Sequence, residues 1–271
     1  MNERTSESAH EMSTSLTAPS RFSSEEVDRF RREGFVIVRN LAGSDLCERM
    51  KATALRDLAG PVEPVEYESD THYPGAPASR DAPGGRAVRR LMQAAGRDSI
   101  FRNWALSDVL AGRLTQLLGP AVAMSQAHHN CVMTKSPAFS SVTGWHQDIR
   151  YWSFARPDLA SAWLALGPER GDNGCLLLVP GSHLLELRRD QYDEAFFFRT
   201  DTEENQKILS RQVAAELDAG DVLFFHARLL HAAGKNHTGL SKLAVVFTYH
   251  ASDNRPLPGT RSASLPDIPL E

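Results

Sequence analysis

The sequence predicts a mainly β protein with flanking helices, arranged as a double-sheet jelly roll, and two observations predict this class. Short apolar and β-branched runs fill the second half of the chain, and turn signals such as GDNG, PGSH and AGD separate them. This pattern favours antiparallel sheets over a parallel sheet. The first half instead carries apolar residues at helical spacing. With 271 residues, 41% of them hydrophobic, the chain is long enough to bury one large core.

The amino-terminal part predicts a tail, a helix, a strand and a second helix. Residues 1–21 are rich in Ser, Thr and Glu and lack an apolar run, so we expect a disordered tail rather than a signal peptide or a membrane helix. The segment SSEEVDRFRREG offers a serine N-cap and acidic residues in the first turn of a helix. FVIVRNL, residues 35–41, predicts a strand, and residues 44–58 predict a helix that Gly60 ends.

Residues 61–118 form the region that we expect to be most variable. Residues 61–85 contain many Pro, Gly, Asp and Ser residues, which predicts a long surface loop of the kind that carries specificity. Residues 86–118 have apolar side chains at mixed helical spacing and predict helices that pack on the sheet. Scattered arginines on a helical segment are usually a solvated face, with anion binding as the alternative. They are Arg86, Arg89, Arg90, Arg97 and Arg102.

The remainder of the chain predicts the strands of the jelly roll. They are expected at residues 121–134, 144–154, 161–167, 175–180, 221–225 and 243–249. We therefore expect residues 22–271 to form a single domain.

Charge and cysteine content limit the partners that we expect. Lys and Arg total 30 against 34 Asp and Glu, so the formal charge of -4 provides no field that attracts nucleic acid or an anionic membrane. The expected partner is a small-molecule substrate, and the sequence does not determine the oligomeric state. The three cysteines lack CxxC spacing, which predicts neither a disulfide framework nor a zinc–thiolate site and favours a cytoplasmic location.

A metal site is the strongest chemical signal in the sequence. In GWHQDIRYW, His146 and Asp148 are two positions apart, so on a strand both side chains face the same side and can bind one metal. In AGDVLFFHARLLHAAGKN, a strand after a tight turn would deliver His231 at its far end. Two histidines and one carboxylate form the facial triad of non-haem Fe(II) oxygenases, which leaves coordination positions open.

Other histidines are weaker candidates for metal ligands. His226 lies five residues before His231 and is the alternative third ligand, although it is more easily a packed strand residue. His128 and His129 are adjacent, so on a strand they point to opposite faces and do not readily share a metal. We expect them in the core or in a pocket wall.

These motifs, with SAWLALGPERGDNGCLLLVPGSH between them, resemble the phytanoyl-CoA dioxygenase family of Fe(II)/2-oxoglutarate-dependent oxygenases in the family's order. The resemblance spans roughly residues 22–249, with a poorly matched stretch at about 61–102. It implies a double-stranded β-helix (cupin-like jelly-roll) core. It also implies Fe(II) held by His146, Asp148 and His231, with 2-oxoglutarate as cosubstrate and dioxygen as oxidant.

The resemblance also implies where the cosubstrate binds. Trp163 and Gln147 stand at positions that contact it in the family, Cys131 falls where the same pocket is lined, and Lys135 matches a lysine that is frequent there. The family usually has an arginine eleven residues after the distal histidine, and here that residue is Lys242. A lysine offers a point charge in place of a bidentate fork.

The substrate and the reaction outcome are less well determined. Arg150, Tyr151 and Arg228 follow the motifs closely and are candidate substrate-binding residues, with sheet packing as the alternative role. The expected reaction is hydroxylation of an unactivated C–H bond, with desaturation, epimerisation or ring formation also open. No catalytic residue is expected beyond the metal ligands. The rival hypothesis is a non-catalytic or cosubstrate-independent metal-binding jelly-roll (cupin-like) protein, which would not need Lys242 or Trp163.

Overall fold

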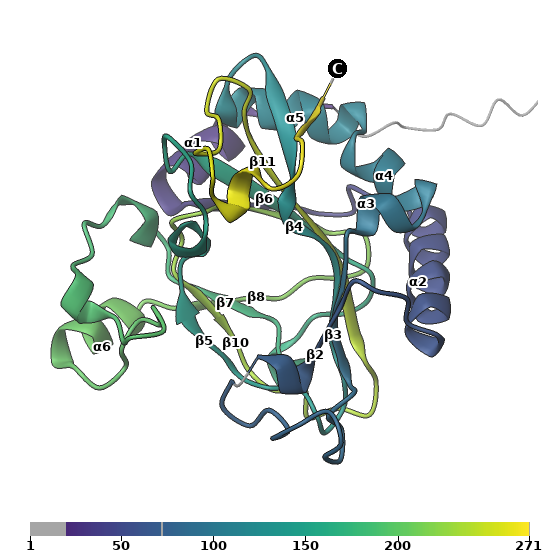
Figure 1. Ribbon diagram of the computed structural model, residues 1–271. Coiled ribbons are helices and arrows are strands. Elements are labelled where there is room, and N and C mark those ends of the chain that lie inside the picture. Colours follow the sequence, from purple (N-terminus) through teal and green to yellow (C-terminus); the bar gives the residue numbers. More distant parts are fainter. Residues whose placement is uncertain (1–19, 72, 271) are drawn as a thin grey trace, which may run out of the picture.

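Two antiparallel sheets form the β-structure of the computed structural model, which describes residues 20–71 and 73–270 (Figure 1). In the large sheet the order is β1 (Phe35–Val38), β9 (Val222–His226), β6 (Leu159–Ala165), β11 (Lys242–Ala251), β4 (Val122–Lys135), β3 (Val88–Met92) and β2 (Val65–Tyr67), and β12 (Ile268–Pro269) pairs with β4. The small sheet has the order β5 (Thr143–His146), β10 (His231–Ala233), β7 (Leu176–Leu178) and β8 (Val213–Ala215). The mainly β, double-sheet prediction is confirmed, whereas the expected tail lies almost entirely outside the described residues.

Helices flank the large sheet and form a lobe beside the small one (Figure 1). The α-helices are α1 (Ser24–Glu33), α2 (Ser44–Ala59), α3 (Ala94–Arg97), α4 (Ser99–Ala105), α5 (Asp108–Leu118) and α6 (Glu203–Leu209). Short 3-10 helices are η1 (Glu68–Asp70), η2 (Asp148–Tyr151), η3 (Gly171–Asn173), η4 (Ser182–Leu184), η5 (Arg189–Gln191) and η6 (Arg261–Ala263). The predicted capping box of α1 is present between Ser23 and Glu26, and Gly34 ends the helix with a left-handed φ of 82°. Among the described residues, no helix is both long and apolar enough to span a bilayer.

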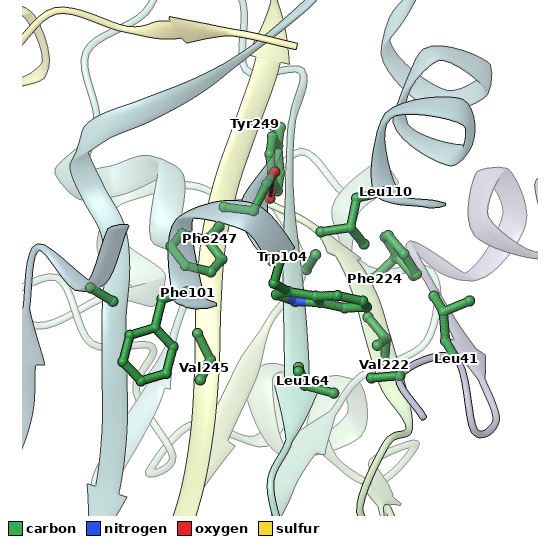
Figure 2. Packing of buried hydrophobic residues seen from close by; sticks show 14 of the residues in the cluster. Leu41, Phe101, Trp104, Leu110, Leu164, Val222, Phe224, Val245, Phe247 and Tyr249 are labelled. Atoms are coloured by element: carbon green, nitrogen blue, oxygen red, sulfur yellow. Dashed lines mark hydrogen bonds between the residues drawn. The ribbon is translucent and has the colours of Figure 1, made fainter. Parts of the chain in front are cut away.

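The main hydrophobic core lies between the large sheet and the helices. Phe101 and Trp104 of α4 are buried against the sheet, and Figure 2 shows Trp104 beside side chains of β6 and β9. Tyr249 of β11 is fully buried, and its hydroxyl donates a hydrogen bond to the carbonyl of Ala105 (2.8 Å). Burying each large apolar side chain stabilises the fold by about 1.5–3 kcal/mol. The helices therefore fix one face of the sheet and leave the other for the site.

A second core fills the space between the two sheets. Cys131, Trp163 and Val246 contribute from the large sheet, and Leu178 and Ala233 contribute from the small sheet. Alternate residues of β11 belong to the two cores, as the two-residue period of a strand buried on both faces requires. The side chains that line this inner space come from both sheets.

The prediction of helices over residues 86–118 is wrong for the first part of this range. Residues 88–92 form strand β3, which pairs with β4 so that Arg90 lies opposite Met133 and Met92 lies opposite Cys131. Pairing with a long central strand overrides local helical spacing, and helices begin only at Ala94. The predicted loop at 61–85 likewise contains β2 and η1.

Strand boundaries near the metal motif also differ from the prediction. The strand expected over 144–154 ends at His146, and η2 follows. The strand expected to carry His231 at its end is two strands, because β9 stops at His226 and β10 begins at His231 in the other sheet. The strands expected at 121–134, 161–167, 175–180, 221–225 and 243–249 correspond to β4, β6, β7, β9 and β11.

Candidate metal centre

Two segments that are distant in sequence bring three side chains together at the inner edge of the small sheet. His231, the first residue of β10, pairs directly with His146, the last residue of β5, and their ring centroids are 4.2 Å apart. The turn into η2 then brings Asp148 beside them, with Oδ1 3.7 Å from His146 Nε2 and 3.8 Å from His231 Nε2. One ligand atom from each residue lies within 4.8 Å of the others.

The backbone fixes which nitrogen of each histidine faces this cluster. Nδ1 of His146 lies 2.9 Å from the carbonyl oxygen of Gly144, and Nδ1 of His231 lies 3.0 Å from that of Leu229. Because a carbonyl oxygen only accepts, each Nδ1 carries a proton, and Nε2 is the nitrogen that faces the cluster. This arrangement orients metal-binding histidines in proteins.

Burial and charge also fit a cation at the cluster. Asp148 is 3% exposed, and its Oδ2 has no hydrogen-bond partner among the described residues. Burial alone would raise the pKa of Asp148, but the neighbouring histidines hold it below its ordinary value, so the carboxylate is charged. Burial and the adjacent His231 lower the pKa of His146 to about 3, so its imidazole is neutral. A buried carboxylate with two imidazoles is a suitable donor set for Fe(II).

The other candidate histidines, His226, His128 and His129, have different surroundings from one another. Nε2 of His226 lies 3.8 Å from Oδ1 of Asp158, and the His226 ring centroid lies 5.3 Å from that of His183. His226 is therefore not part of the cluster. His129 points toward the cluster, with its Nδ1 3.6 Å from Asp148 Oδ2, while His128 contacts Ser262. Both rings nevertheless contact Trp152, at 4.9 and 5.3 Å, because the pairing of β4 with β11 is irregular here and the two residues do not simply face opposite sides.

A cavity next to the two histidines is lined by cationic side chains. Arg89 and Arg90 come from β3, Lys135 from β4 and Lys242 from β11. Arg89 donates hydrogen bonds to Ser141 (3.1 Å) and Thr143 (2.9 Å). The expectation of a solvated arginine face is wrong for Arg89 and Arg90, because β3 turns both toward the interior.

Lys242 is held by a buried carboxylate that the sequence did not indicate. Its Nζ lies 2.9 Å from Oε2 of Glu169, which is fully buried, and Trp163 donates its indole N–H to Oε1 of the same residue (2.8 Å). The Lys242 ammonium also lies 5.0 Å from the centre of the Trp163 ring. Glu169 therefore orients two of the five residues expected to contact the cosubstrate, Lys242 and Trp163.

Lys135 lies directly opposite Lys242 in the pairing of β4 with β11, and both are buried. Like charges at opposite positions destabilise a sheet unless something neutralises them. The Lys135 ammonium donates to the carbonyl of Ser141 (2.9 Å) and contacts no carboxylate within ion-pair distance among the described residues. Burial, together with Arg89 and Lys242, lowers the pKa of Lys135 to about 7. Among the four cations of the cavity wall, Lys135 is thus the one that lacks a carboxylate partner among the described residues.

This depressed pKa predicts a pH dependence of stability. In the metal-free protein, the unfolded chain holds the Lys135 proton up to about pH 10.5 while the folded state releases it near pH 7. Since the unfolded state then binds more protons, the free energy of unfolding should rise with pH between these values. Urea denaturation at several pH values should show a shallower rise in Lys135→Met, whereas Lys207→Met on the surface should behave as wild type. Parallel curves for all three proteins would contradict the prediction.

Gln147 and Cys131 lie near the cavity but have other contacts. The side-chain amide of Gln147 donates to the carbonyl of Arg228 and accepts from the Tyr192 hydroxyl (2.7 Å). Cys131 is in the core between the sheets, with its sulfur 3.5 Å from that of Met133, which does line the cavity. Burial raises the pKa of Cys131 to about 11, so it is a neutral thiol. Their assignment to the cosubstrate stays a prediction.

The three substrate-binding candidates occupy different surroundings. Tyr151 is 40% exposed, and its ring centroid is 6.3 Å from that of His146. The guanidinium of Arg150 stacks on Tyr192, 3.1 Å from its ring centre. Arg228 donates to the carbonyl of Leu185 (2.8 Å) and is not among the cavity-lining residues. Of these three residues, only Tyr151 therefore has a ring contact with one of the candidate metal ligands, His146.

The chain is similar to a known protein family and to several of its characterised members. Residues 30–244 match the family model described as phytanoyl-CoA dioxygenase (PhyH). The peroxisomal phytanoyl-CoA dioxygenase of Rattus norvegicus is 26% identical over 243 residues, which cover 83% of this chain and 67% of the relative. The ectoine dioxygenase of Stutzerimonas stutzeri (strain A1501) is 24% identical over 247 residues, which cover 85% and 77%.

Solved structures show the same fold. EctD from S. alaskensis, crystallised with 2-oxoglutarate and 5-hydroxyectoine, aligns with a TM-score of 0.73 and 21% identity over 87% of this chain and 78% of that one. The epimerase SnoN, in complex with Fe3+, alpha ketoglutarate and nogalamycin RO, aligns with a TM-score of 0.69 and 24% identity over 90% and 93%. The expected double-stranded β-helix core is confirmed.

Proposed function

The chain belongs to the phytanoyl-CoA dioxygenase family of Fe(II)/2-oxoglutarate-dependent oxygenases, and from this premise we propose that it hydroxylates an unactivated C–H bond of a small-molecule metabolite. We assign Fe(II) to His146, Asp148 and His231, because their donor types suit that ion and one ligand atom from each lies within 4.8 Å of the others. When bound, such an iron couples oxidative decarboxylation of 2-oxoglutarate to oxidation of a substrate by dioxygen.

The observation that carries the proposal is the cationic cavity beside the triad. Four cations line it, and they have contacts with three carboxylates: Glu66, Glu68 and Glu169. With Lys135 protonated, one positive charge remains, and a ferrous ion bound to Asp148 adds one more. A dianion such as 2-oxoglutarate would neutralise the site. A cosubstrate-independent metalloprotein has no need for this excess of charge.

In this proposal, each side chain of the 2-oxoglutarate site has its own role in binding. Lys242 and Lys135, on the neighbouring strands β11 and β4, bind the carboxylate of 2-oxoglutarate that is far from the iron. Their two point charges replace the bidentate arginine of the family. Trp163 packs against the same end, and Arg90 adds positive charge from β3. Arg89, Lys135 and Lys242 are buried in the cavity wall, and this low exposure to water strengthens their electrostatic contacts.

The reaction outcome depends on how the substrate is placed. Hydroxylation is the outcome that we favour, whereas the structural neighbours include the epimerase SnoN and the carbocyclase SnoK, which share only the fold. We also propose a reducing compartment such as the cytoplasm, because Cys47, Cys131 and Cys175 are all free and buried.

The first experiment is anaerobic titration of the protein with Fe(II) and then 2-oxoglutarate. We expect the weak visible charge-transfer band of a chelated 2-oxo acid, and Lys135→Met should need roughly 10-fold more 2-oxoglutarate, since one charge-assisted contact contributes about 1.5–3 kcal/mol. Under air, wild type should release succinate from 2-oxoglutarate. Iron binding without either signal would instead favour the cosubstrate-independent jelly-roll alternative.

A further inference from the structure

Aromatic rings from three separate segments gather around His146. Phe197, from the turn that follows η5, lies 6.1 Å from the His146 ring centroid, and Tyr151 of η2 lies 6.3 Å from it. Tyr73, from the loop after η1, meets Phe197 edge to face at 5.2 Å and also lines the cationic cavity. We call Tyr73, Tyr151 and Phe197 the aromatic collar.

The collar keeps aromatic surface accessible beside the metal centre. Tyr151 is 40% exposed, and Tyr73 and Phe197 are partly buried. The Tyr151 hydroxyl donates to the carbonyl of Ala195 (3.2 Å), which ties η2 to the turn that carries Phe197. Accessible rings that cluster next to a candidate active site are typical of a surface that binds a ligand.

The backbone is shaped to place Phe197 at this position. A side chain at Gly144 would put its Cβ 2.9 Å from the Phe197 ring, so only glycine leaves room for the ring against β5. The preceding residue, Phe196, has a left-handed φ of 66°, which is strained for a bulky side chain. Such strain persists where the surroundings impose it, and it clusters at ligand sites.

Side-chain contacts supply those surroundings. Arg150 lies over the Phe196 ring at 4.8 Å as well as over Tyr192, and Asp193 Oδ1 accepts the backbone N–H of Phe197 (2.8 Å). The N–H of Phe198 then donates to the carbonyl of Trp145 in β5 (2.7 Å). Phe197 is therefore held in place by contacts on both sides.

The charges near the collar distinguish among ligand classes. An acyl-CoA carries several phosphates and would need several free cations. Of the cations near the loop that follows Tyr73, Arg80 pairs with Asp70 (2.9 Å), and Lys235, whose ammonium lies beside Gly75, is a single charge. Arg189 is bonded to the carbonyls of Tyr192 and Asp193. A small quaternary ammonium could also rest on these rings through cation–π contacts, so glycine betaine is the competing ligand in the test below. Its chemistry fits a flat, largely apolar ligand.

We propose that the substrate contains a planar ring system that stacks within the aromatic collar, with the carbon to be oxidised toward the iron. This inference rests on the proposed function and adds the substrate class to it. Aromatic stacking contributes about 0.5–1.5 kcal/mol per pair beyond simple burial, so each ring of the collar has a measurable share of binding.

The test is calorimetric binding to the anaerobic protein loaded with Fe(II) and 2-oxoglutarate. Three probes are compared: anthraquinone-2-sulfonate as a planar ring system, decanesulfonate as a linear chain with the same head group, and glycine betaine as a small zwitterion. We expect measurable binding of the anthraquinone alone. Tyr151→Leu and Phe197→Leu should each weaken it about threefold to tenfold.

Phe139→Leu is the matched control, because Phe139 is 41% exposed but makes no ring contact with the collar among the described residues. It should bind the anthraquinone as wild type does. Retention of the 2-oxoglutarate charge-transfer band in every variant shows that the fold and the iron site persist. Tighter binding of decanesulfonate or betaine, or equal anthraquinone binding by all variants, would overturn the substrate class. Absence of the band in wild type would instead refute the proposed function.

Discussion

Replacing His231 by Ala is expected to abolish the charge-transfer band with 2-oxoglutarate and to stop succinate release. His231 supplies one of three donors, and its Nε2 is already directed toward Asp148 through the Nδ1 contact with Leu229. Loss of a residue that only supports a metal ligand costs roughly 10–100-fold in affinity or activity, so loss of a ligand should exceed that. Anaerobic Fe(II) titration and succinate assays measure both effects.

His226→Ala is the matched control for this experiment. His226 ends β9 five residues before His231 begins β10, but it lies beside Asp158. We expect the His226 variant to bind iron and 2-oxoglutarate as wild type does. If His226→Ala lost the band and His231→Ala kept it, the assignment of the triad would be refuted.

Replacing Lys242 by Met is expected to destabilise the fold and to weaken 2-oxoglutarate binding. The ion pair with Glu169 is buried, with side-chain exposures of 5% and 0%. Removing one partner of a buried pair leaves an uncompensated charge and costs about 3–5 kcal/mol. Relief of the repulsion between Lys242 and Lys135 should bring the cost toward the lower end. The free energy of unfolding in urea gives the value.

The double variant Lys242→Met/Glu169→Gln separates stability from cosubstrate binding. Removing both charges should restore most of the lost stability, because replacing a buried pair is often close to neutral. The affinity for 2-oxoglutarate should stay roughly 10- to 100-fold below wild type if Lys242 receives its carboxylate. Recovery of affinity together with stability would show that Lys242 is structural only.

Several features of this protein follow from the sequence because they depend on neighbouring residues. The capping box of α1 lies within four residues, and the turn signals divide the chain into short strands close to the observed ones. The pair His146 and Asp148 could be identified from its spacing, even though the strand ends at His146 and the turn into η2 presents the carboxylate. The resemblance of the flanking motifs identified His231.

Tertiary structure alone decided the partners of the charged and aromatic residues. Glu169 meets Lys242 across 73 positions, and Arg89 reaches Thr143 across 54. The helical spacing around Arg90 concealed a strand, because pairing with β4 is a long-range interaction that local propensity does not record.

In the aromatic collar, too, the sequence contains a local signal, but only the fold brings the rings together. The cue was available as the sequence FFF at residues 196–198, but no local pattern indicated that Phe197 packs on Gly144 beside His146. The sequence by itself therefore determined the fold class, the metal-binding motifs and the family. The folded chain decided which charges are neutralised and which rings lie beside His146, because those contacts join segments that are far apart along the chain.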